Sequence, residues 1–112
     1  MKTVVLPSAR ADILRQAGYF IELGMDRLAG RFIEAVRSAI DDVSHTPYAG
    51  SPRPMRSRRL AGVRTWAIDG FDEMKVYYLV TDHELVIVRI LHGRRDIERI
   101  FEDQFPDDLA DL

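Results

Sequence analysis

Cysteine is missing from this 112-residue chain, and lysine occurs only twice. Without cysteine the protein has neither disulfide cross-links nor thiolate metal ligands. Long apolar stretches are missing as well, since no segment approaches the ~20 residues of a membrane-spanning helix. The apolar run in the N-terminal segment MKTVVLPSARAD is too short for a secretory signal peptide. Together these absences predict a cytoplasmic protein.

Motifs that hold cofactors are also missing. The glycines form no phosphate-binding loop, because Gly70 and Gly93 stand isolated. The three histidines, His45, His83 and His92, are not spaced as metal ligands with carboxylates. The spacing of the serines, histidines and aspartates along the chain gives no support for a Ser/His/Asp catalytic triad. The sequence therefore predicts no cofactor, no metal and no assigned catalytic residue.

What is present is a globular composition with unevenly distributed charge. Hydrophobic residues make up 46% and charged residues 30% of the chain, which fits one domain over residues 1–112. The net charge is −2, but the last eleven residues, EDQFPDDLADL, are rich in acids. This tail, from about residue 104, is expected either to be flexible or to pack back on the arginines. No acid lies between Val43 and Ile68, a stretch with five arginines, which predicts either a face for an acidic macromolecule or a solvated loop.

The first half of the chain predicts a strand followed by a helical hairpin. The β-branched segment Lys2–Leu6 predicts a buried strand that Pro7 ends, and Ser8 is expected to cap the first helix. Gly24 predicts the end of this helix, and Asp26 is expected to cap the second. The apolar positions at helical spacing are Ile13, Ala17, Phe20 and Ile21, then Leu28, Phe32, Ala35, Val36, Ala39 and Val43. The short link between the helices predicts an antiparallel pair.

The second half predicts a loop, a meander and a closing helix. Residues Ser44–Gly62 contain three prolines and no periodicity, which predicts a long loop that is either functional or a connector. The predicted strands are Val63–Ile68, Met74–Val80 and Glu84–Leu91, and the predicted closing helix runs from Arg94 to about Asp103. The sequence thus predicts an α+β fold: an N-terminal strand, an α-helical hairpin, a three-stranded antiparallel meander completing a mixed sheet, and a short C-terminal helix.

Arg89 and His92 are the most conspicuous polar residues of the last predicted strand. By strand alternation, Arg89 shares a face with Leu85, Ile87 and Leu91, and His92 shares the other with Val86, Val88 and Ile90. A buried arginine either grips an anionic ligand or forms a structural ion pair, with Asp96 or with an acid elsewhere, and we favour the ion pair. His92 is either a proton-transfer group or, as we favour, a histidine that only donates or accepts a structural hydrogen bond.

Arg64 and Trp66 share one face of the predicted strand that follows the loop. An aromatic ring beside arginines can stack on a base. The simpler interpretation, which we favour, places Trp66 in the core. From the residues alone, the chain is a small domain with an arginine-rich binding surface whose target is not identified.

Three stretches, in order and covering most of the chain, resemble a known family. They are ARADILRQAGYFIELG, RLAGVRTWAIDGF leading into VYYLV, and VIVRILHGRRDIERIF. In this the chain resembles the ParE/RelE family of bacterial toxins, and especially the ParE-like, plasmid-stabilisation branch of type II toxin–antitoxin systems. The resemblance implies inhibition of DNA gyrase and neutralisation by a ParD-like antitoxin in a hetero-oligomer. RelE-like members of the same fold instead cleave messenger RNA on the ribosome.

The residues favour the gyrase inhibitor over the ribonuclease. RelE-like toxins carry basic residues on the sheet, which Arg64 and Arg95 match here, and typically a tyrosine near the end. Phe101 stands at the position of that tyrosine and has no hydroxyl to move a proton. His92 is the one alternative proton carrier. A third possibility is a non-toxic binding protein of the same fold.

Two sets of contact residues follow from this resemblance. The residues expected to face the target are Arg58, Arg59, Arg64, Arg89, His92, Arg94 and Arg95. The residues expected to bind the antitoxin lie on the helical hairpin and are Leu14, Phe20, Leu23, Phe32 and Val36. For each member of the second set the alternative role is packing against the sheet, which we favour.

Overall fold

The computed structural model describes residues 1–105, so most of the predicted acidic tail lies outside the described residues. In chain order the elements are β1 (Lys2–Val5), α1 (Pro7–Glu22), α2 (Asp26–His45), β2 (Ser51–Pro52), a short 3-10 helix η1 (Arg58–Leu60), β3 (Arg64–Ile68), β4 (Phe71–Val80), β5 (Glu84–His92) and α3 (Ile97–Gln104). This composition confirms the predicted α+β fold.

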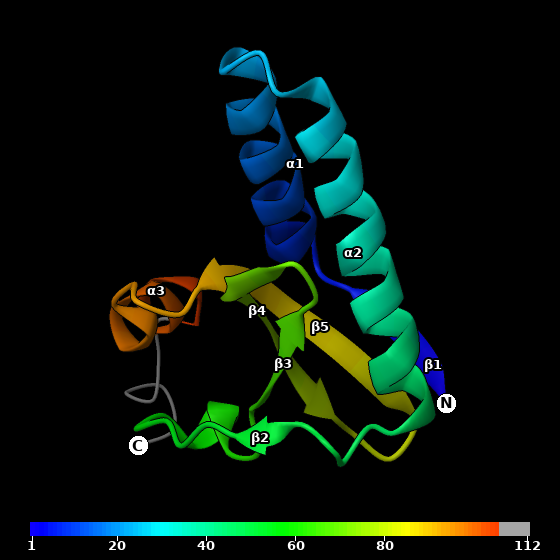
Figure 1. Ribbon diagram of the computed structural model, residues 1–112. Helices are drawn as coiled ribbons and strands as arrows, with labels where there is room; N and C mark the ends of the chain where they lie inside the picture. The colour runs from blue at the N-terminus through cyan, green and yellow to red at the C-terminus, as the bar shows by residue number, and fades with distance from the viewer. Residues whose placement is uncertain (106–112) are drawn as a thin grey trace.

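The strands form one mixed sheet in the order β1-β5-β4-β3-β2. The first strand, β1, runs parallel to β5, while all other neighbours are antiparallel. The predicted meander and the mixed character of the sheet are therefore confirmed. Figure 1 shows the hairpin of α1 and α2 standing over the sheet, with its tip extending beyond it.

The turn between α1 and α2 depends on Gly24. This residue has a φ of 76°, a left-handed conformation that glycine adopts without steric cost. The N–H of Met25 donates to the carbonyl of Phe20 at 2.8 Å, and that of Gly24 to Ile21 at 2.9 Å. These two bonds make a Schellman motif, which ends α1 and reverses the chain at the predicted place.

Both predicted helix caps are wrong. Helix α1 begins at Pro7, whose fixed φ suits the first helical position, and the Ser8 hydroxyl donates to the carbonyl of Val88 at 3.0 Å instead. Helix α2 has no side-chain cap, and Asp26 is its first residue. There its carboxylate lies near the positive end of the helix dipole, which explains its position without a capping bond.

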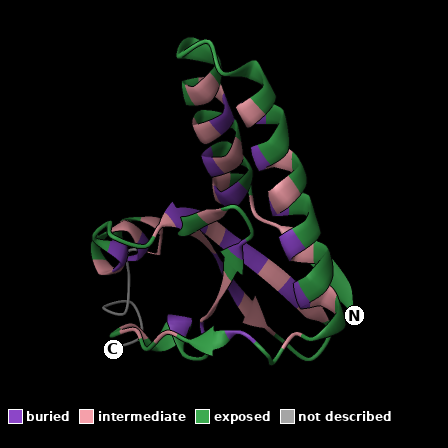
Figure 2. Ribbon diagram, viewed as in Figure 1, coloured by how far each residue is buried: buried purple, intermediate pink, exposed green. Residues whose placement is uncertain are grey.

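Each face of the sheet is covered by a separate apolar cluster, as the nearly continuous apolar run of β5 predicts. The hairpin-side cluster contains Ala9, Phe32, Val36, Ala39, Val43, Ile68, Val76, Tyr78, Leu85, Ile87 and Ile90. The α3-side cluster contains Leu60, Val63, Tyr77, Val88, Leu91, Ile97 and Phe101. In Figure 2 the buried positions follow the strands and the inner sides of the helices. Trp66 packs against the hairpin-side cluster, as predicted.

Several predicted element boundaries differ from those of the structure. The segment predicted as one loop contains the end of α2, the edge strand β2 and η1. Strand β4 begins at Phe71, three residues early, because Phe71 pairs with Ile68 across the turn. Helix α3 begins at Ile97, since the Asp96 carboxylate accepts the Arg99 N–H at 3.2 Å and so holds the N-cap.

A bulge in β5 overturns the predicted alternation of its side chains. Consecutive residues Tyr77 and Tyr78 of β4 face Arg89 and Ile87, so Val88 is an extra residue in the ladder. One inserted residue exchanges the two faces beyond it. The spacing predicted that Arg89 and Ile87 share a face, and this prediction is wrong because of the bulge.

Candidate functional site

Helix α1 covers the part of the β5 edge that β1 leaves open. Strand β1 pairs with β5 only as far as Ile87, and the N–H of Leu6 donates to the Ile87 carbonyl at 3.0 Å. Beyond it, the Ser8 hydroxyl binds the Val88 carbonyl, and the Ile90 N–H donates to Asp12 at 3.0 Å. Side chains of α1 thus replace a neighbouring strand, which protects an otherwise exposed edge.

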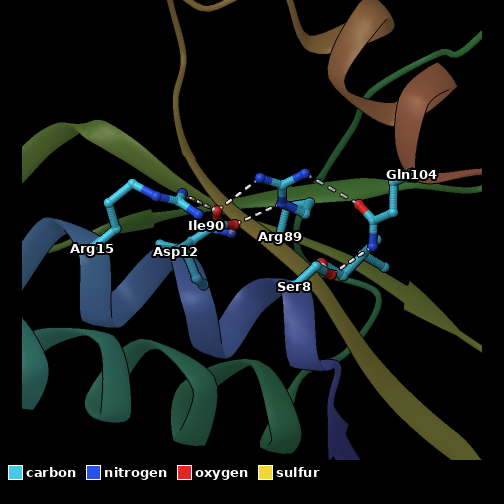
Figure 3. Close-up of polar contacts among 7 residues, drawn as sticks. Ser8, Asp12, Arg15, Arg89, Ile90 and Gln104 are labelled. Atoms are coloured by element: carbon cyan, nitrogen blue, oxygen red, sulfur yellow. Dashed lines mark hydrogen bonds and ion pairs between the residues drawn. The ribbon is translucent and has the colours of Figure 1, made fainter.

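Asp12 and Arg89 form an ion pair at this edge (Figure 3). Asp12 is 4% exposed, and its two carboxylate oxygens each accept from the Arg89 guanidinium at 2.7 Å. Arg15 adds a third donor group at 3.1 Å. The structural ion pair predicted for Arg89 is confirmed, but its partner is Asp12 and not Asp96.

Arg89 also contacts helix α3. Its second terminal nitrogen lies 3.5 Å from the Gln104 side-chain oxygen, and the Gln104 amide donates to the Ser8 hydroxyl at 2.6 Å. This chain of polar contacts joins α1, β5 and α3. The Arg89 side chain is 15% exposed, so the structure places it between elements and not on the open surface.

The segment His92-Gly93-Arg94-Arg95-Asp96 forms the connection from β5 to α3. The His92 Nδ1 accepts the Arg94 N–H at 3.2 Å, which puts the ring proton on Nε2, where it donates to Glu73 at 2.7 Å. The other Glu73 oxygen binds the Arg94 guanidinium at 3.0 Å. Both ring nitrogens of His92 are therefore engaged in holding the turn against the start of β4.

Tyr78 and Arg64 fix the segment that follows α2. The buried Tyr78 hydroxyl accepts the Gly50 N–H at 3.0 Å and donates to the Pro47 carbonyl at 2.9 Å. A Cβ at Gly50 would overlap this hydroxyl, so glycine is required. Arg64 donates to the carbonyls of Tyr48 and Gly50 and lies 5.7 Å from the centre of the Tyr48 ring. Arg64 thus has a structural role, and its predicted role in facing the target stays a prediction.

Burial raises the pKa of Tyr77 and of Tyr78 above the ordinary 10.0. The positive charge of Arg53 lowers the pKa of Tyr77 by less than burial raises it. For Tyr78 the same holds for the hydrogen bond with the Gly50 backbone and the charge of Arg64. As the pH rises above 10.0, these two hydroxyls lose their protons in the unfolded chain before they lose them in the folded protein. We therefore expect the free energy of unfolding to be unaffected by these groups below pH 10.0 and to fall as pH rises through their folded pKa values. Urea unfolding from about pH 9 to about pH 11 measures this, and Tyr77→Phe should lessen the fall. Stability that rises over this range would contradict it.

The other arginines of the basic stretch and of the turn after β5 differ in their ion pairs and in their exposure. Arg53 and Arg56 each lie 3.9 Å from the Glu98 carboxylate of α3, so part of the basic stretch is neutralised. Arg58 and Arg59 are exposed on η1. Arg95 is exposed, and its guanidinium makes no hydrogen bond or ion pair within residues 1–105.

The residues predicted to bind an antitoxin separate into core and surface. Phe32 and Val36 are buried residues of α2 in the hairpin-side cluster, so they belong to the core. Phe20 of α1 packs against the same cluster. Leu14 and Leu23 are 64% and 54% exposed. Core packing, the favoured alternative, thus holds for three of the five residues.

An open groove of about 360 Å³ lies between α1 and α2, next to β1. Its lining residues are Val5, Arg10, Ile13, Leu14, Ile33, Val36, Arg37 and Ile40. Sequence reasoning missed Ile33, Arg37 and Ile40, although their spacing of four and three residues marks a second stripe along α2. The groove has an apolar floor with arginine at its rim and no acid in its lining.

Within residues 1–105, no helix combines the length and apolar character needed to cross a membrane. Over the same residues, no three histidine, aspartate or glutamate side chains gather as a possible metal site. The arrangement therefore offers two surfaces: an apolar groove on the hairpin and an arginine-bearing rim at the end of β5.

Comparison with known proteins gives a consistent match. The family model described as "ParE toxin of type II toxin-antitoxin system, parDE" matches residues 4–97. A structure of the chromosomal ParDE TA system from P. aeruginosa has a TM-score of 0.68 at 20% identity, covering 82% of this chain and 95% of that one. A YoeB/ParE toxin from Agrobacterium tumefaciens has a TM-score of 0.55 at 23% identity, covering 82% and 98%. At these identities the two structures show a shared fold alone. The search of curated sequences found no significant match.

Proposed function

Because the chain belongs to the ParE toxin family of type II toxin–antitoxin systems, we propose that it inhibits DNA gyrase and that a ParD-like antitoxin holds it inactive. The observation that carries this choice over messenger RNA cleavage is that, of the described residues, neither Phe101 nor His92 is available for proton transfer at the end of β5. Gyrase inhibition needs a binding surface, whereas cleavage by a 2′-hydroxyl needs groups that move protons. The proposal implies a cytoplasmic protein without enzymatic activity of its own.

Phe101 supports this choice because it is part of the core. It is fully buried, and its ring lies 5.7 Å from that of Tyr77 in an edge-to-face arrangement. The position that resembles the tyrosine of RelE-like toxins thus has no hydroxyl and faces inward. A side chain there packs α3 onto the sheet and does not meet a substrate.

His92 supports the same choice through its hydrogen bonds. One ring nitrogen accepts from the backbone of Arg94, and the other donates to Glu73. A general base must have a free lone pair within reach of the proton it removes. His92 has none in this arrangement, so its role in the proposal is to hold the turn that presents Arg94 and Arg95.

Phe101→Tyr should not create a ribonuclease. The added hydroxyl would be buried without a partner beside Tyr77, so we expect a loss of about 1–3 kcal/mol in the free energy of unfolding. Urea unfolding measures the loss, and messenger RNA cleavage in a cell-free translation system measures the activity. Cleavage by the variant, absent from the wild type, would reveal an otherwise intact nuclease site and contradict this prediction.

Arg95→Ala should weaken gyrase inhibition by about 10-fold or more, since arginine anchors dominate many interfaces. The fold should be unaffected, because the Arg95 side chain is exposed and makes no hydrogen bond or ion pair with any residue up to Phe105. The measurement is the concentration of toxin that halves DNA supercoiling. Arg31→Ala, an exposed arginine of α2, is the control. Equal potency of both variants would remove Arg95 from the target surface.

The antitoxin is proposed to occupy the hairpin groove. An apolar floor takes anchors at helical spacing, and the two arginines in its lining, Arg10 and Arg37, favour an acidic segment. Leu14 is the anchor point most open to a partner, because it is exposed and lines the groove. Leu23 lies near the tip of the hairpin and is the second candidate.

A further inference from the structure

A small pocket lies where α1 meets the end of β5, on the hairpin side of the sheet. Its lining residues are Asp12, Arg15, Gln16, Met74, Ile90, Leu91, His92 and Arg95. We propose that this pocket binds a phosphate group, held by Arg15, Gln16 and Arg95. The proposal rests on the proposed function, which it deepens by giving the ligand chemistry of Arg95.

The donors reach the pocket from two separate parts of the fold. Arg15 and Gln16 belong to α1, while Arg95 follows β5. The Arg15 side chain is 65% exposed and uses one terminal nitrogen on Asp12, so its other N–H groups are available. The side chains of Gln16 and Arg95 make no hydrogen bond or ion pair within residues 1–105. Guanidinium groups suit phosphate because their planar forks donate two parallel hydrogen bonds.

The pocket is electropositive despite the carboxylate in its wall. The lining residues and their ion-pair partners contain Arg15, Arg89 and Arg95 against Asp12 and Glu73, an excess of one positive charge. The Glu73 carboxylate is itself paired with Arg94. Both Asp12 oxygens are already taken by Arg15, Arg89 and the N–H of Ile90. An entering anion therefore meets unpaired donors more readily than the Asp12 charge.

The size of the pocket selects the ligand. Its volume is about 60 Å³, whereas pockets for drug-sized ligands measure about 300–1,000 Å³. A nucleobase therefore does not fit, but a single oxyanion group replacing a few waters does. Two guanidinium groups and an amide offer more donors, from more directions, than the two coplanar oxygens of a carboxylate use, which favours a tetrahedral phosphate.

The test is a titration of the isolated, isotope-labelled chain with sodium phosphate at constant ionic strength, followed by NMR. We expect saturable shifts at Gln16 and Arg95 with a millimolar dissociation constant. The shifts should be lost in Arg15→Gln and in Arg95→Gln, and retained in Arg31→Gln, which removes the same charge from α2. Circular dichroism verifies that each variant is folded. Titration with sodium acetate under the same conditions should give at least 10-fold weaker binding.

A second titration, with a short DNA duplex, separates a backbone phosphate from a small free phosphate. If the backbone supplies the group, Arg95→Gln should reduce the slope of log K against log salt by about 1, while Arg31→Gln leaves it unchanged. If DNA does not bind and inorganic phosphate does, the site takes a small phosphate compound. Absence of saturable phosphate shifts, or equal binding of acetate, overturns the proposal. Neither titration involves gyrase, so failure here is distinct from failure to inhibit supercoiling.

Discussion

Asp12→Ala should lower the free energy of unfolding by about 3–5 kcal/mol, because it leaves the Arg89 guanidinium unpaired at a mostly buried site. It also deprives the Ile90 N–H of its acceptor at the edge of β5. Urea unfolding followed by circular dichroism measures the loss. Asp41→Ala, which removes an exposed carboxylate from α2, should change stability by no more than about 0.5 kcal/mol.

The double variant Asp12→Ala with Arg89→Met sharpens this prediction. Removing both charges eliminates the unpaired guanidinium, so the double variant should be more stable than the sum of the two single losses implies. A loss below about 1 kcal/mol for Asp12→Ala would show that Asp12 does not hold the edge of β5 as described.

Phe32→Ala should lower the free energy of unfolding, measured with urea, by about 3–5 kcal/mol, since the Phe32 ring is fully buried in the hairpin-side cluster. It lies 5.2 Å from the ring of Phe71 and 6.0 Å from that of Phe20, both in edge-to-face geometry. Loss of this ring removes the aromatic contact between the helices and the turn that starts β4.

Leu14→Ala is the matched comparison on the same hairpin. Leu14 is largely exposed, so the substitution should change the free energy of unfolding by no more than about 0.5 kcal/mol. Affinity for the antitoxin should fall by about 10-fold, as expected for an anchor in an apolar groove. Titration calorimetry with the cognate antitoxin measures this. Unchanged affinity of a folded Leu14→Ala variant would exclude Leu14 from the groove contact.

The sequence predicts well those features that are determined locally. Gly24 ends α1 because a left-handed residue is needed there, and the short link makes the hairpin antiparallel. The three strands of the meander follow from their β-branched and aromatic residues and from the glycine turn at Gly70, whose φ is 80°. The N-cap contact of Asp96 with Arg99 is also local, although helix α3 was predicted to begin at Arg94.

Features that depend on distant residues are not predictable in this way. Asp12 lies 77 residues from Arg89, and neither residue signals the other in the sequence. The bulge at Val88 shifts the faces of β5 without any glycine or proline to mark it. Strand β2 contains a proline and only two residues, so it is a strand only because β3 lies beside it.

The candidate site shows the same division. The arginines after β5 stand out in the sequence, but their neighbours Arg15 and Gln16 reach the rim only through the packing of α1 on β5. The separation of Phe32 from Leu14 depends on which side of the hairpin meets the sheet. A helical period gives the stripes of a helix, while the tertiary arrangement decides which stripe is buried.

The most direct test of the proposed function is DNA supercoiling by purified gyrase with increasing amounts of the antitoxin-free chain. The account predicts loss of supercoiling or accumulation of cleaved DNA, reversed by the antitoxin, with messenger RNA left intact on translating ribosomes. Unaffected gyrase in the presence of a folded, antitoxin-binding chain that cleaves messenger RNA on the ribosome would contradict it.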